Sequence, residues 1–267
     1  MGVTSTRGVE AERRLADAAT ELEREHRRAT DEIDALRRFE RRVRALDTET
    51  PQRKTAGPTL AAASFDDGPS GSDALGRVRE AYESTVMAVS HYGEEYDDTY
   101  AESLAGEFDA HVAIALTEGS AFDERCKTTL LAAVTESVTA RRSLLAAVDE
   151  ESESLSAATD ELRSVAERLD ALSERSLVGE SFGDLDAYRA QLDQLETNCE
   201  SVLQRRQRSV FDQRRAAWLP NDAPDVAKYL YQNLEDDYPV MAVIADLLER
   251  IDARRRQIEH AMTFCHA

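Results

Sequence analysis

The residues of this 267-residue chain whose types and spacing could support chemistry gather in residues 81–100, AYESTVMAVSHYGEEYDDTY. On a helix, His91 would share a face with Glu94, Glu95 and Asp98, which follow it by three, four and seven positions. An imidazole beside several carboxylates can bind a divalent cation or transfer a proton. The same pattern is typical of a solvated acidic helix face, and we favour that interpretation because acids occur throughout the chain. We therefore predict no metal, no cofactor and no catalytic residue.

Other signals for catalysis are weak. The Glu-x-x-His spacing of carboxylate-bridged metal bundles occurs once, at Glu23 and His26, whereas such bundles need it on two helices. The three cysteines are far apart and odd in number, which argues against a disulfide framework or a zinc site. No glycine-rich phosphate loop and no G-x-S-x-G motif is present. We expect a protein that is not an enzyme, and a metal-dependent enzyme centred on His91 is the least favoured alternative.

Two short stretches are candidates for protein contacts. Tyr92 stands beside His91 and Glu95, and Trp218 is the only tryptophan, in the helix-breaking sequence AAWLPND. Aromatic side chains often anchor protein–protein interfaces. We predict that these four residues contact a protein partner or a second copy of the chain.

Arginines near the end of a predicted helix form a candidate basic patch. Its members are Arg205, Arg206, Arg208, Arg214 and Arg215. Attraction to phosphates weakens steeply in concentrated salt because it depends on counterion release, and no nucleic-acid recognition motif is present. Docking against acidic helix faces is therefore our first interpretation of the patch, and a nucleic-acid-associated regulator is the second.

The charge of the chain indicates where it works. Acids outnumber bases 53 to 33, the formal net charge is −20, and only Lys54, Lys127 and Lys228 are lysines. This composition is typical of cytoplasmic proteins of extreme halophiles, in which molar salt screens the repulsion between like charges. An acidic protein from an ordinary high-GC organism is the alternative. The apolar runs are too short to cross a bilayer, so we expect a soluble cytoplasmic protein without membrane contact.

The spacing of hydrophobic residues predicts that the chain has three parts. Residues 1–47 contain a coiled-coil-like helix whose apolar residues recur every seven positions. Residues 48–72 contain three prolines and three glycines, which predicts a flexible linker. Residues 73–267 are expected to form a helical bundle. The N-terminal helix could then move relative to that bundle.

The bundle is predicted to be all-α and elongated, since no segment alternates with a period of two. Its first helix covers 73–108 and carries the 81–100 stretch, and Gly93 is the position at which this helix can kink or be interrupted. Three tyrosines of that stretch lie on the predicted buried stripe: Tyr82, Tyr96 and Tyr100. A second, very long helix covers about 121–175, and a turn at 178–183 reverses the chain. The next helix can therefore pack back against it as a long antiparallel helical hairpin.

The stretch VREAYESTVMAVSHYGEEYDDTYAESLAGEF at 78–108, with YPVMAVIADLL at 238–248, resembles a haloarchaeal family of uncharacterised helical proteins. The family pattern is V-R-x-A-Y, then T-V-M-x-V-x-H-Y, then E-E-Y-D, and this chain matches it from Val78 to Asp97. Ser90 stands where the pattern has proline, so the helix break expected there would be softened. The resemblance implies a halophilic helical protein and no activity. We expect a non-enzymatic protein that oligomerises or scaffolds other proteins.

Overall fold

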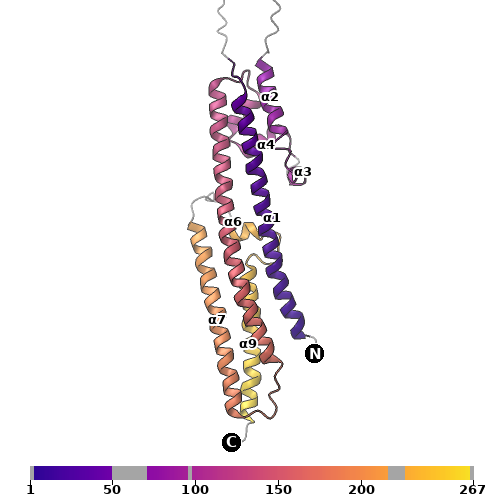
Figure 1. The fold of residues 1–267 in the computed structure, drawn as a ribbon, viewed down its shortest axis with the longest axis vertical. Coiled ribbons are helices and arrows are strands. Elements are labelled where there is room, and N and C mark those ends of the chain that lie inside the picture. The colour runs from indigo at the N-terminus through magenta and orange to yellow at the C-terminus, as the bar shows by residue number, and fades with distance from the viewer. Residues whose placement is uncertain (1–2, 50–70, 96–97, 216–225, 265–267) are drawn as a thin grey trace, which may run out of the picture. The chain divides into compact units, whose positions relative to one another are not determined.

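The computed structural model describes residues 3–49, 71–95, 98–215 and 226–264 (Figure 1). In this part of the chain all regular structure is helical, which confirms the predicted all-α class. The helices are α1 (Val3–Ala45), α2 (Gly71–Glu83), α3 (Tyr92–Glu95), α4 (Tyr100–Glu107), α5 (Ala110–Thr117), α6 (Glu124–Ser173), α7 (Phe182–Arg215), α8 (Val226–Leu230) and α9 (Pro239–Thr263). None of these helices combines the length and apolar character that crossing a membrane requires.

The chain divides into two compact units. Unit 1 comprises Met1–His26 and Ala146–Ala267, and unit 2 comprises Arg27–Leu145. The boundaries fall inside α1 and inside α6, so each of these long helices supplies residues to both units. The predicted linker over 48–72 lies largely outside the described residues, and the predicted three-part division stays a prediction.

Unit 1 contains the predicted helical hairpin. The seven-residue repeat of α6 is buried along this unit, at Val148, Leu155, Leu162 and Leu169. After α6 the chain reverses through a turn in which Gly179 has a φ of 84°, a left-handed conformation that glycine adopts without strain. In Figure 1, α7 (orange) therefore runs back beside this part of α6, and α9 (yellow) packs on α7.

Unit 2 is built around a cluster of aromatic rings. Tyr82 from α2 makes edge-to-face contacts with Phe39 of α1, Tyr100 of α4 and Phe108, with ring centroids 5.2, 5.7 and 6.0 Å apart. All four side chains are buried. Burial raises the pKa of Tyr100 to about 12 and raises that of Tyr82 further. The prediction that Tyr82 and Tyr100 lie on a buried stripe is confirmed, and Tyr96 lies outside the described residues.

The helix predicted over 73–108 is broken, and the break begins after Glu83, well before Gly93. α2 ends at Glu83, and turns lead through His91 to the single turn of α3. A straight helix would place Tyr82 and Tyr100 about 27 Å apart along its axis, whereas their ring centroids are 5.7 Å apart. The chain has to break so that both rings can reach the same core.

Local hydrogen bonds show how the break forms. The carbonyl of Tyr82 accepts hydrogen bonds from the amides of Thr85, Val86 and Met87, at 3.1, 2.8 and 3.3 Å. The Thr85 hydroxyl donates to the carbonyl of Ala81 at 2.6 Å. In a regular helix the Thr85 amide would make this bond, but here that amide donates to Tyr82, so the helical hydrogen-bond pattern ends. The break thus begins before Ser90, so serine in place of proline does not preserve the helix.

Candidate functional site

His91 is part of a charge network in unit 2. Its Nε2 lies 3.1 Å from one carboxylate oxygen of Glu32, and Arg141 donates to the other oxygen at 2.6 Å. Arg141 also donates two hydrogen bonds to Glu107, at 2.8 and 2.7 Å. Burial opposes the charge of Arg141, but the two carboxylates prevail and raise its pKa above the ordinary value. His91 is only 9% exposed, so its side chain is packed inside unit 2 and is not presented to solvent.

The metal hypothesis gains no support from this geometry. In the described ranges, no group of three or more His, Cys, Asp or Glu side chains is arranged to hold a metal ion. Asp98, which the predicted helix placed on the face of His91, is reached only after the helix has broken. The carboxylate beside His91 comes instead from Glu32, far away in the sequence.

The predicted protein-contact residues are only partly placed by the structure. Tyr92 is half-buried and lines a cavity of about 190 Å³ in unit 2, next to Tyr82 and Arg141. Burial raises the pKa of the Tyr92 hydroxyl. The Glu95 side chain and the whole of Trp218 lie outside the described residues. Their role at an interface stays a prediction, as does that of Tyr92.

The predicted basic patch does not present one continuous surface. Arg206 is 3% exposed and pairs with the fully buried Glu151 at 2.7 Å. Arg205 is exposed and pairs with Glu161 across the hairpin, and Arg208 is exposed. The side chains of Arg214 and Arg215 lie outside the described set. Of the three arginines that the structure places, one is therefore directed into the interior.

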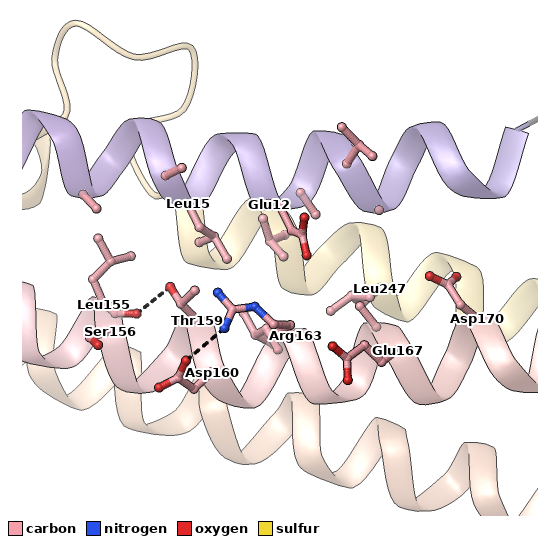
Figure 2. Close-up of a pocket in the computed structure, with 18 of the residues that line it drawn as sticks. Glu12, Leu15, Leu155, Ser156, Thr159, Asp160, Arg163, Glu167, Asp170 and Leu247 are labelled. Atoms are coloured by element: carbon pink, nitrogen blue, oxygen red, sulfur yellow. Dashed lines mark hydrogen bonds and ion pairs between the residues drawn. The ribbon is translucent and has the colours of Figure 1, made fainter.

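A groove in unit 1 has a volume of about 890 Å³. It lies between the first turns of α1 and the second half of α6, with α9 behind them (Figure 2). Its floor consists of buried aliphatic side chains from the three helices: Leu15, Leu155, Leu162, Val243 and Leu247. A volume of this size and an apolar floor are typical of binding sites.

Small side chains form the walls of the groove. On α1 these include Gly8, Ala16 and Ala19, and on α6 they include Ser156 and Ala166. Short side chains allow the backbone of another helix to approach closely, at the 8–10 Å or so between axes that is usual for packed helices.

One continuous face of α6 lines the groove. Its lining positions are spaced by three or four residues: Ser152, Ser156, Thr159, Arg163, Ala166 and Asp170. From the first to the last of these positions, the face is about 27 Å long at the helical rise of 1.5 Å per residue. A groove of this length can accept one face of a helix of about 18 residues.

Charged side chains stand along both walls. On α6, Arg163 donates to Asp160 at 3.3 Å, and Asp170 pairs with Arg250 of α9. Glu12 of α1 and Glu167 of α6 line the groove from opposite helices, and both are exposed (Figure 2). Neither forms an ion pair with a side chain that the structure describes. The groove therefore has an excess of negative charge.

Sequence reasoning did not find this groove. No single small residue of α6 that lines the groove indicates a binding site. The sequence predicts burial for the seven-residue leucine repeat of this helix, which lies beside those small residues. The available signal was the second face of the same helix, where serine, threonine and alanine recur at helical spacing. That signal becomes informative only when α1 is known to lie opposite.

Comparison with known proteins gives a family and no function. A sequence model of a protein family, described as Domain of unknown function (DUF7260), matches residues 13–255. No curated protein and no solved structure shows a significant match.

Proposed function

We propose that this chain, which belongs to the family of unknown function DUF7260, is a non-enzymatic interaction protein that holds a protein partner or a second copy in the groove of unit 1. The observation that carries this proposal is the groove of about 890 Å³ between α1 and α6, whose lining positions on α6 extend over a length suited to a helix. We propose that the interaction takes place in a halophilic cytoplasm, as the charge of −20 and the scarcity of lysine suggest.

The chemistry of the groove supports binding in preference to catalysis. Its lining residues include no histidine and no cysteine, and the Thr159 hydroxyl is engaged with the carbonyl of Leu155 at 2.8 Å. A nucleophile with an adjacent general base, which covalent catalysis requires, is not found among them. The metal alternative centres on His91, which is buried and lies beside Glu32. The nucleic-acid alternative rests on five arginines, of which Arg206 is buried and Arg205 is paired with Glu161.

The test is to fill the groove. In the double variant Ala16→Phe, Ala166→Phe, two large rings occupy the walls at positions that are exposed or half-buried, so we expect the fold to persist. The matched control is Ala187→Phe, Ala190→Phe on an exposed part of α7 outside the groove. Each tagged protein is purified from its native cells in molar KCl. Retained proteins are identified by mass spectrometry, and its oligomeric state is measured by light scattering.

We expect the groove-filling variant to lose a stoichiometric partner, or its own oligomeric state, that the control retains. Circular dichroism establishes that both variants have the helical content of the parent protein. If the two variants retain the same partners and the same mass as the parent, the groove is not an interaction site and the proposal fails.

A further inference from the structure

We infer that the occupant of the unit 1 groove is a basic amphipathic helix of another protein, with an apolar face on the leucine floor and arginine or lysine side chains against the walls. This inference rests on the proposed function and specifies the partner. It depends on the floor of the groove and on its charges. It also depends on whether a basic helix of a second copy has an apolar face free to bind.

The floor and walls determine the shape of the occupant. Leucine and valine side chains at the floor are almost completely buried, and the residues beside them are alanine, serine and glycine together with charged side chains such as Glu12 and Glu167. A helix that places residues i, i+3, i+4 and i+7 on one face matches a surface of this kind. An extended strand would leave its backbone hydrogen-bonding groups unpaired against such a floor, at a cost in free energy.

The charges determine the chemistry of the occupant. Arg163 is already paired with Asp160, and Asp170 is paired with Arg250, so these side chains are compensated within the chain. Glu12 and Glu167 face the groove from opposite walls with no ion-pair partner among the described residues. A helix with basic residues on both flanks of its apolar face would place a cation near each of these carboxylates. A helix with acidic flanks would add repulsion to a chain whose net charge is already −20.

A second copy of the chain fits these requirements poorly. Its basic helical segments already bury their apolar stripes in their own units: Leu36, Phe39 and Val43 of α1 beside the arginines at its end, and Ile251 and Ile258 of α9 around Arg254–Arg256. The basic segment of α7 likewise buries Val202 and Val210, and its one large apolar side chain that is more than half exposed is Phe211. A single exposed ring is not an apolar helix face, so the described surface offers no basic helix with a complete uncovered apolar stripe.

The experiment uses the full-length protein and two fluorescent helical peptides of 18 residues. Both peptides have the same Leu/Ala face; one has arginine at every flanking position and the other has glutamate. Binding is followed by fluorescence anisotropy at a KCl concentration at which circular dichroism shows the protein fully helical. The test variant is Glu12→Gln, Glu167→Gln, and the control is Glu118→Gln, Glu200→Gln, which removes the same charge from exposed positions outside the groove.

We expect the arginine peptide to bind the parent protein about tenfold more tightly than the glutamate peptide, and more weakly as KCl is raised. The Glu12→Gln, Glu167→Gln variant should raise the Kd of the arginine peptide by about tenfold, while the control changes it less than about twofold. Equal binding of the two peptides, or equal effects of the two charge variants, would overturn the inference, as would no binding of either peptide.

These results separate the inference from the proposed function. If Ala16→Phe, Ala166→Phe removes a native partner while Glu12→Gln, Glu167→Gln leaves peptide binding unchanged, the groove binds a protein but not a basic helix. If the groove-filling variant instead converts an oligomer of the chain to a monomer, a second copy is the occupant. The proposed function then stands and this inference is wrong.

Discussion

At the residue scale, three hydrogen-bonded groups converge on Glu151, which is fully buried in unit 1. Arg206 forms the ion pair, the Tyr231 hydroxyl donates at 2.6 Å and the side-chain amide of Gln213 donates at 3.1 Å. Burial and the neighbouring carboxylate raise the pKa of Tyr231. The sequence DEESES around Glu151 reads as a solvated acidic run, yet one of its carboxylates joins α6, α7 and the segment after α8.

Replacing Arg206 with methionine should be strongly destabilising. The change leaves the Glu151 carboxylate buried without its cation, and removing one partner of a buried ion pair costs about 3–5 kcal/mol. The free energy of unfolding is measured by urea titration at constant KCl. Arg205→Met is the matched control, because Arg205 pairs with Glu161 at the surface, where the loss should be about 0–1 kcal/mol.

A double variant separates charge burial from packing. Glu151→Leu with Arg206→Met removes both charges, so it should be less destabilising than Arg206→Met alone, although the Tyr231 hydroxyl loses its acceptor. Equal losses of stability for Arg205→Met and Arg206→Met would contradict the assigned role of Glu151.

At the element scale, the helices that follow the break in unit 2 depend on their caps. α4 starts at a capping box: the amide of Glu102 donates to the Thr99 hydroxyl at 3.4 Å, and the amide of Thr99 donates to the Glu102 carboxylate at 2.9 Å. The Thr99 hydroxyl also donates to the Glu102 carboxylate, at 2.6 Å, and this bond together with the one from the Thr99 amide lowers the pKa of Glu102. Because α4 has only eight residues and carries Tyr100 and Leu104 into the core, its start is important for the packing of unit 2.

Thr99→Ala should therefore reduce the free energy of unfolding by about 1 kcal/mol, the usual cost of losing an N-cap side chain. Relative to the parent protein, the Thr99→Ala variant should show faster amide hydrogen exchange in α4, with a smaller change in α6. The control is Thr117→Ala at the end of α5, where the hydroxyl only donates back to the carbonyl of Ala113 and caps no amide. A larger loss for Thr117→Ala would contradict the importance of the capping box.

At the scale of the whole molecule, the net charge of −20 opposes compact folding unless salt screens it. We predict that the melting temperature rises steadily as KCl is raised from about 0.1 M, where the Debye length is about 10 Å, towards 2 M. Thermal unfolding is followed by circular dichroism at each concentration. A melting temperature independent of KCl would favour the alternative of an ordinary acidic protein.

Several features of this protein follow from its sequence alone because they depend on contacts between near neighbours in the chain. The all-α class, the length of α6 and the burial of Val148, Leu155 and Leu162 follow from apolar residues at helical spacing. The reversal between α6 and α7 follows from the glycine-containing turn at 178–183. Each of these signals lies within a few helical turns of the element that it specifies.

Other features were decided only by tertiary structure, because their partners are distant in the sequence. His91 faces Glu32, and Arg206 faces Glu151, so residues that resemble surface groups in the sequence are buried. The helix break after Glu83 arises because the rings of Tyr82 and Tyr100 share one core, a requirement that helical periodicity does not contain. The groove likewise exists because small residues of α1 and α6 lie opposite one another, and neither helix alone encodes that pairing.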